Sequence, residues 1–159
     1  MLPIKKILVP ISGSDVSLSD VSLEALNYTS SLVRESDITV YLMTVIENNQ
    51  SIYDAYEDQT LLAQRKLKTF SLVNGMLVEA EKKAKDMGMQ SIITVANLGT
   101  PHQQITRMAA DVKIDLIVMG THGHSGITRL LAGSVTEEVI KTAPCPVVIV
   151  RPHEGLCHQ

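Results

Sequence analysis

The segment from Gly120 to Val135 follows an apolar run and combines glycines with a serine at spacings that suit an anion. Gly120, Gly123 and Gly133 allow a turn off the strand, close backbone approach and a compact entry into a helix, because no Cβ is in the way. Ser134 stands where that helix is expected to begin, and the free amides of a helix start point at an anion. The chemistry indicated is phosphate binding rather than a reaction.

The glycine spacing separates this segment from two common phosphate loops. No Gly-Lys-Ser/Thr follows, as a Walker A loop requires, and the G-x-G-x-x-G pattern of dinucleotide-binding loops is missing. A partly buried phosphate at a helix start gains up to about 2 kcal/mol from the helix dipole, so several backbone amides must share the binding. The alternative is a tight strand-to-helix connection that binds no ligand.

The elements that must position this loop follow from the hydrophobic pattern. Helical patterns separate short apolar runs, and near-continuous apolar strands that alternate with helices predict a parallel sheet covered on both faces. The predicted strands are 4–10, 38–46, 91–96, 114–119 and 146–150, and the predicted helices are 23–35, 61–87, 101–112 and 135–142. The glycine segment therefore leaves the fourth strand.

Local signals mark two helix boundaries. Thr100, Pro101 and Gln103 predict an N-cap, a proline at the first helical position and a capping-box partner. Gly88 stands where the long second helix is expected to stop. Residues 47–64 give mixed signals, so the region before that helix is left unassigned.

A perfect tandem repeat follows the first strand. Ser-Asp-Val-Ser-Leu at 14–18 is repeated at once at 19–23. A five-residue unit is too short for a repeat architecture, so we expect a local duplication that lengthens the loop or the first helical turn.

Composition limits the classes of protein and partner. With 159 residues and 45% hydrophobic residues, the chain suits one domain with a full core. A net charge of -3 and 3% aromatic residues argue against nucleic acid, which needs clustered basic residues or stacking rings. No apolar run approaches the roughly 20 residues of a membrane span, and Cys145 and Cys157 form no disulfide framework. We expect a cytoplasmic protein that binds no membrane.

The pattern G-x-x-G, nine residues and G-S resembles the ATP-binding branch of the universal stress protein family. The resemblance extends over nearly the whole chain, through residues 6–10, 115–120, 133–140 and 143–150. It implies a single doubly wound five-stranded parallel sheet of order 3-2-1-4-5, an α/β fold with helices on both faces. The domain would span residues 1–152, and 153–159 would form a flexible tail.

The resemblance also implies a ligand site at the switch point of the sheet, where open α/β sheets bind ligands. ATP with Mg2+ is the implied cofactor, and ADP, AMP or a cyclic nucleotide are left open. The implied adenine and ribose contacts are Pro10, Ile11, Ser12, Val45, Met119 and Gly120. The implied phosphate contacts are Gly123, His124, Gly133, Ser134 and Val135.

Two features depart from the family pattern. Ser12 stands where the family usually has an aspartate, so a carboxylate that could engage the nucleotide or its metal is missing. The tandem repeat adds about five residues between the first strand and the first helix. Both departures lie on the side of the site that should hold the base.

The function that the resemblance implies is a nucleotide-dependent stress regulator that acts on a protein partner as a homodimer. The dimer would form through the last strand, Pro146 to Val150, because an apolar strand at a sheet edge invites pairing. The alternative is a nucleotide-free dimeric interaction module of the same fold.

Other chemistries fit the residues less well. His122 and His124 lack a nearby carboxylate or cysteine, so no metal site is predicted. Ser12 begins a stretch that is similar to an ATP pyrophosphatase loop but lacks its second glycine. We therefore predict at most slow ATP hydrolysis or phosphate transfer to the protein itself. Cys145 lies between two prolines and is expected to be a buried small hydrophobe rather than a reactive thiol.

Overall fold

The computed structural model describes residues 3–14, 17–34, 37–47, 58–121 and 135–151. Within them, one five-stranded parallel sheet has the spatial order β5-β4-β1-β6-β7. Its strands are β1 (Lys6–Pro10), β4 (Thr39–Ile46), β5 (Ser91–Leu98), β6 (Leu116–Gly120) and β7 (Val147–Val150). This is the predicted order 3-2-1-4-5, so the doubly wound α/β fold is confirmed.

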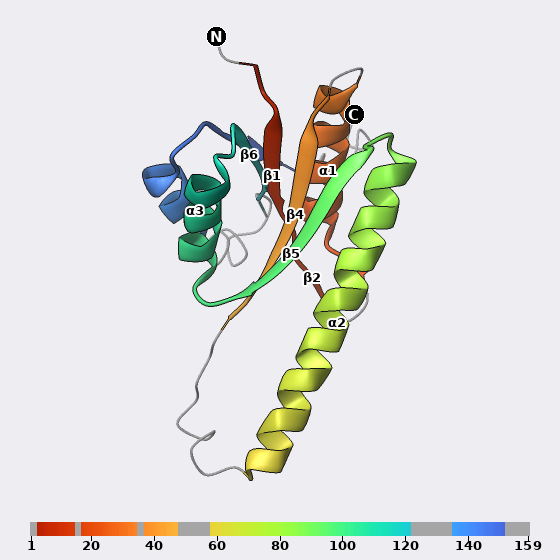
Figure 1. Ribbon diagram of the computed structural model, residues 1–159, viewed down its shortest axis with the longest axis vertical. Coiled ribbons are helices and arrows are strands. Elements are labelled where there is room, and N and C mark those ends of the chain that lie inside the picture. The colour runs from red at the N-terminus through yellow and green to blue at the C-terminus, as the bar shows by residue number, and fades with distance from the viewer. Residues whose placement is uncertain (1–2, 15–16, 35–36, 48–57, 122–134, 152–159) are drawn as a thin grey trace, which may run out of the picture.

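Helices cover both faces of the sheet. α1 (Asp20–Val33) and α2 (Gln59–Asp86) lie on one face, while α3 (Pro101–Val112) and the helical residues 135–142 lie on the other (Figure 1). The central strand β1 is buried on both sides: Ile7 and Val9 pack with α1 and α2, and Leu8 packs toward α3. Two-sided burial explains why the strands are almost continuously apolar.

The long helix α2 is only partly packed. Its buried residues, Met76, Leu77, Ala80 and Ala84, all belong to its second half. The first half runs on beyond the end of the sheet (Figure 1). No helix among the described residues is both long and apolar enough to cross a membrane.

Two predicted helix boundaries have different outcomes. The stop at Gly88 is confirmed, because α2 ends at Asp86 and Gly88 has a φ of +98°, a conformation that favours glycine. Thr100 does precede α3 and Pro101 is the first helical residue, but the Thr100 side chain makes no capping hydrogen bond. The predicted capping box is therefore wrong. The helix begins there because proline fixes φ and needs no amide partner.

The two copies of the tandem repeat adopt different structures. Two short strands, β2 (Gly13–Ser14) and β3 (Ser17–Leu18), form an antiparallel pair. The pair covers the first copy, 14–18, and includes Gly13, the residue before it. In the second copy, the Ser19 hydroxyl caps α1 by accepting a hydrogen bond from the Ser22 amide at 3.2 Å. The duplication thus lengthens the loop and also starts the helix at Asp20, three residues before the predicted start.

Candidate functional site

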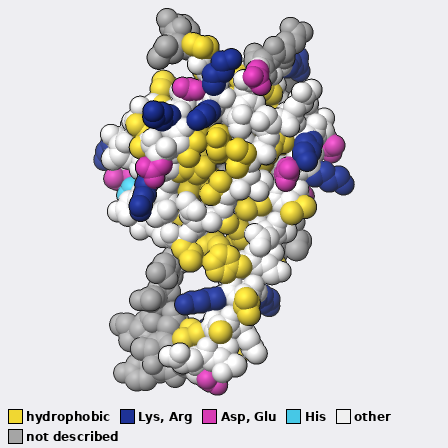
Figure 2. Space-filling model, in the orientation of Figure 1, with side chains coloured by type: hydrophobic (Ala, Val, Ile, Leu, Met, Phe, Trp, Pro, Cys, Tyr) yellow, Lys and Arg dark blue, Asp and Glu magenta, His cyan; other side chains and the backbone are white. Residues whose placement is uncertain are grey.

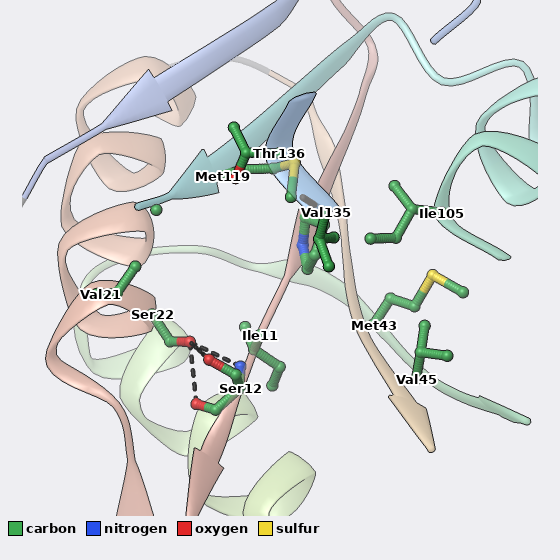
Figure 3. A pocket seen from close by; sticks show the side chains of 12 residues that line it. Ile11, Ser12, Val21, Ser22, Met43, Val45, Ile105, Met119, Val135 and Thr136 are labelled. Carbon is green, nitrogen blue, oxygen red and sulfur yellow. Dashed lines mark hydrogen bonds between the residues drawn. The ribbon is translucent and has the colours of Figure 1, made fainter. Parts of the chain in front are cut away.

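A cavity of about 200 Å3 lies at the carboxyl ends of β1, β4 and β6. β1 pairs with β4 on one side and with β6 on the other, and the chain passes from β1 through α1 to β4. The cavity therefore lies at the switch point, where ligands of open α/β sheets bind. Its lining is Pro10, Ile11, Ser12, Val21, Ser22, Met43, Val45, Ile105, Met119, Gly120, Val135 and Thr136 (Figure 3).

The structure brings together many of the predicted site residues around this cavity. Those that line it are Pro10, Ile11, Ser12, Val45, Met119, Gly120 and Val135. Gly123, His124, Gly133 and Ser134 lie outside the described residues, as do His122 and most of the glycine segment. The cavity is thus lined by the predicted base side of the site and by Val135, the last residue of the glycine segment.

Five lining residues were not predicted: Val21, Ser22, Met43, Ile105 and Thr136. Met43 was within reach of sequence reasoning, because residues two apart on a strand face the same side and Val45 is among the predicted contacts. Thr136 adjoins Val135. Ile105 comes from α3, and no local pattern links that helix to the end of β4.

Most of the cavity wall is apolar. Ile11 from the loop after β1, Met43 and Val45 of β4, Met119 of β6 and Ile105 of α3 are among the apolar side chains around it (Figure 3). The lining contains no charged side chain among the residues that the structure describes. A flat, uncharged ligand group suits such a wall, because its binding removes apolar surface from contact with water. A few polar groups of the site then fix the orientation of the ligand.

The loop that leaves β1 is held in place by two hydrogen bonds with β4. The Ile11 amide donates to the Met43 carbonyl oxygen at 2.8 Å. The Thr44 hydroxyl donates to the Ile11 carbonyl oxygen at 3.3 Å. Ile11 is therefore fixed on both polar groups of its backbone, and its side chain is presented to the cavity.

Three serine hydroxyls form a hydrogen-bonded cluster at one side of the cavity. The Ser12 amide donates to Ser22 Oγ at 2.7 Å, and Ser22 Oγ donates to the Ser12 carbonyl oxygen at 3.0 Å (Figure 3). Ser19 Oγ lies 3.0 Å from Ser22 Oγ and 3.1 Å from Ser12 Oγ. This cluster joins the β1 loop to the first turn of α1 with uncharged groups.

Close packing gives Gly120 a structural reason that was not predicted. It is the last residue of β6, and its φ is not among the positive values of the described glycines, so it does not adopt the left-handed conformation that favours glycine. Instead, a Cβ at Gly120 would lie 2.5 Å from the Val21 carbonyl oxygen and closer still to Val21 Cγ1. Glycine is required here because the start of α1 packs directly on the end of β6.

Cys145 agrees with the expected unreactive role. It is half-buried and packs on the cluster beneath α3. Burial, which disfavours the thiolate, and the nearby Asp115 carboxylate raise the pKa of the Cys145 thiol, while a hydrogen bond with the Ile117 backbone opposes them. A thiol with a raised pKa is a poor nucleophile at neutral pH.

The described residues offer little to a metal ion. No group of three or more histidine, cysteine, aspartate or glutamate side chains converges in this part of the chain. Mg2+ in nucleotide sites usually takes one or two protein carboxylates as well as phosphate oxygens. The described part of the cavity wall is uncharged, with Ser12 in place of an aspartate, so it does not fit a Mg2+ ion held by protein carboxylates.

Comparisons with known proteins agree with this fold. The model of the universal stress protein family matches residues 3–151. The universal stress protein MJ0531 of Methanocaldococcus jannaschii is 37% identical over 147 residues, which cover 92% of this chain and 82% of that protein.

Solved structures extend the comparison. The protein MJ0577 is 27% identical with a TM-score of 0.68, over 96% of this chain and 99% of its own. A universal stress protein in complex with cAMP is 26% identical with a TM-score of 0.63, over 94% of this chain and 98% of its own. The protein UspA from Lactobacillus plantarum shares the fold, with 22% identity and a TM-score of 0.75 over 95% of this chain and 100% of its own. The chain belongs to the universal stress protein family.

Proposed function

We propose that this chain binds an adenine nucleotide at the switch-point cavity and passes the occupancy of that site to a protein partner. The observation that carries this proposal is the convergence of residues from the ends of β1, β4 and β6 on one cavity whose described lining is mostly apolar and uncharged. Binding, rather than catalysis, is the proposed activity. The complex of a relative with cAMP, 26% identical to this chain, supports an adenine nucleotide as the ligand class.

The base and ribose are proposed to occupy the described cavity. Its volume of about 200 Å3 is below the roughly 300–1,000 Å3 of whole ligand sites, so it suits part of a nucleotide. The aromatic base would lie against Ile11, Val45 and Met119, while the hydroxyls of Ser12 and Thr136 are available for polar contacts.

The phosphates are proposed to lie toward the start of helix 135–142. Val135 and Thr136 line the cavity at that point, and amides at a helix start favour anions. Gly123, His124, Gly133 and Ser134 remain the predicted phosphate contacts. We expect any Mg2+ to enter on the phosphates of ATP, because the described wall supplies no carboxylate.

The experiment measures the ligand directly. Freshly purified protein is denatured, and the released small molecules are identified by chromatography and mass spectrometry. Calorimetric titrations with ATP, ADP, AMP and cAMP, each with and without Mg2+, then rank the nucleotides. We expect an adenine nucleotide to bind, with AMP and cAMP independent of Mg2+. A protein that releases no nucleotide and gives no heat with any of the four would favour the nucleotide-free interaction module instead.

The working unit is proposed to be a homodimer through β7, as the family resemblance implies. β7 lies at the edge of the sheet and pairs with β6 alone among the described strands. Substituting Val147 by proline tests this arrangement, since proline is tolerated at the first residue of a strand but cannot donate to a neighbouring strand. Light scattering should show a smaller mass for Val147→Pro than for the wild type. An unchanged mass would place the dimer contact elsewhere.

A further inference from the structure

The opposite edge of the sheet presents a longer unpaired strand. β5 pairs with β4 along all eight of its residues, and no other strand pairs with it in the part of the chain that the structure describes. Figure 1 shows β5 along the front of the molecule, between α3 and α2. Ser91–Leu98 contains no charged residue and no proline. Charged side chains and prolines are features by which natural edge strands usually avoid pairing with other chains, and β5 has neither.

The hydrogen bonds of β4 and β5 show which groups of this edge are open. The Gly99 amide donates to the Ile46 carbonyl oxygen of β4 at 3.0 Å. Because backbone groups alternate in direction along a strand, the amides and carbonyls of odd-numbered residues point toward β4. Those of Ile92, Thr94, Ala96 and Leu98 therefore point outward. This edge therefore offers four residues, every second one along the strand, whose amide and carbonyl groups point outward.

β7 offers a smaller edge by the same reasoning. The Ile117 amide donates to the Pro146 carbonyl oxygen, and the Thr121 amide donates to the Val150 carbonyl oxygen, each at 3.0 Å. Even-numbered residues of β7 therefore point toward β6. Within this strand only Val147 and Ile149 point outward, which is half of what β5 presents.

Exposed apolar side chains lie on the open strand itself. Ile93 and Leu98 of β5 are 44% and 52% exposed, and α2, which contacts β5, exposes Leu67 and Val78 along its length at 70% and 68%. Figure 2 shows hydrophobic side chains gathered at the centre of this face and continuing below it. An apolar centre with a charged rim is the usual anatomy of a protein interface.

The rim carries positive and negative side chains both on α3 and on α2. Arg107 and Asp111 form an exposed pair on α3, with 3.9 Å between Nε and Oδ2, and Lys83 and Glu79 form a pair of the same length on α2. A strongly acidic or basic partner gains little from such a rim. A partner with the same balance of charges meets no net repulsion at this rim, and a second copy of this chain has that balance.

We propose that β5 pairs antiparallel with β5 of a second copy, around a two-fold axis at Val95. In this register Thr94 lies opposite Ala96 of the partner subunit, and Ile92 lies opposite Leu98 of the partner subunit. All four outward-pointing residues of each strand then exchange hydrogen bonds, as in an antiparallel ladder. Because the contact is isologous, one self-complementary patch satisfies both copies. This contact is additional to the proposed β7 dimer and extends assembly beyond it.

The first test uses proline at an outward-pointing amide. Thr94→Pro removes an amide that β4 does not use, and proline is tolerated on edge strands in that orientation. Sedimentation velocity across a concentration series should show wild-type protein increasing in mass as concentration rises, and Thr94→Pro remaining smaller at every concentration. Thr94→Val, which keeps the amide, is the matched control and should assemble like the wild type. Equal masses for all three proteins would overturn the proposal.

The second test is register-specific and independent of nucleotide binding. Cys145 and Cys157 are first replaced by serine. Opposed residues at a non-hydrogen-bonded position have Cα atoms about 4.5 Å apart, which is within disulfide range, so Val95→Cys should cross-link under oxidation. Ile93→Cys is the control, because its two copies would lie about 14 Å apart. Cross-linking of both variants, or of neither, would overturn the two-fold at Val95, and nucleotide titration of the same proteins reports separately on the proposed function.

Discussion

The Ser22 hydroxyl binds both polar groups of the Ser12 backbone, accepting from its amide at 2.7 Å and donating to its carbonyl oxygen at 3.0 Å. Ser22 is 3% exposed, so water cannot readily replace these bonds. One side chain of α1 therefore determines the path of the loop that leaves β1. The cavity wall at Ile11 and Ser12 depends on it.

Ser22→Ala should destabilise the fold by about 1–3 kcal/mol, because the Ser12 amide and carbonyl lose their partner in a buried place. The same change should weaken nucleotide binding, since the loop beside the cavity loosens. Urea unfolding and calorimetry measure the two effects. Ser30→Ala is the control, because the Ser30 hydroxyl is exposed and bonds only within its own helix. Equal stability of the two variants would show that the serine cluster does not hold the loop.

Ser12→Asp should make ATP binding depend on Mg2+. A carboxylate at this position repels phosphates directly but attracts a magnesium ion that the phosphates carry. We expect weaker binding of ATP than in the wild type without Mg2+, and recovery when millimolar Mg2+ is added. Ser12→Asn, which has similar size and no charge, should show neither effect. A titration in which both variants respond alike to Mg2+ would contradict the role assigned to charge at this position.

Gly120→Ala should destabilise the fold by about 1–3 kcal/mol, because the new Cβ collides with Val21 and overpacking strains the contact between α1 and β6. Val21→Ala should rescue only part of this loss, since the Val21 carbonyl oxygen stays 2.5 Å from the new atom.

Gly75→Ala provides the opposite control for Gly120→Ala. Gly75 lies inside α2, and no neighbouring atom lies within 4 Å of the place that an alanine methyl group would take, so alanine should stabilise the helix by roughly 0.5–1 kcal/mol. Thermal unfolding of the two variants should therefore shift in opposite directions. A destabilised Gly75→Ala would show that glycine at that position has another role.

Val45→Trp should abolish binding of adenine nucleotides, because the indole fills much of a cavity of about 200 Å3. Val45 is half-buried at the end of β4, so the larger ring has room to turn toward the cavity without entering the core. Ile140→Trp on helix 135–142 is the control, since Ile140 is 54% exposed. Unchanged nucleotide affinity in Val45→Trp would place the base outside this cavity.

Cys145 should react slowly with iodoacetamide near pH 8.5, where an ordinary cysteine is about half ionised. Its raised pKa keeps the thiol protonated, so the rate should increase only as the pH rises further. The measurement uses a Cys157→Ser protein, and the same protein unfolded in urea gives the reference rate. A folded protein that reacts as fast as the unfolded one would contradict the burial of this thiol.

Hydrophobic pattern alone predicted the parallel sheet, because parallel strands buried on both faces are apolar along their length. The order of the strands and the β1 side of the site were predicted through the family resemblance, which named Pro10, Ile11 and Ser12. Val21 and Ser22 were missed because the start of α1 was predicted at Leu23, after both residues. The two copies begin with Ser14 and Ser19, and either serine could cap the first helix. Local sequence cannot distinguish them because the copies are identical.

Long-range packing explains the other differences. Ile105 reaches the cavity because α3 packs on the same face of the sheet as Met43 and Met119, a fact that no local pattern contains. Gly120 was predicted as a glycine that allows a turn off the strand, and its contact with the neighbouring helix is a second reason that the prediction lacked. The requirement comes from Val21, which is far away in sequence and adjacent in space.

The duplicated pentapeptide has a consequence for how this protein can change over generations. The Ser19 amide donates to the Ser12 carbonyl oxygen at 2.9 Å, so Ser12 and the capping serine are held together although six residues separate them in sequence. Because the two copies are identical, an in-frame loss of either leaves the same shorter chain with one capping serine and one Ser22 equivalent. Direct repeats are gained and lost by replication slippage, so the length of the connection between Ser12 and α1 is an inherited variable.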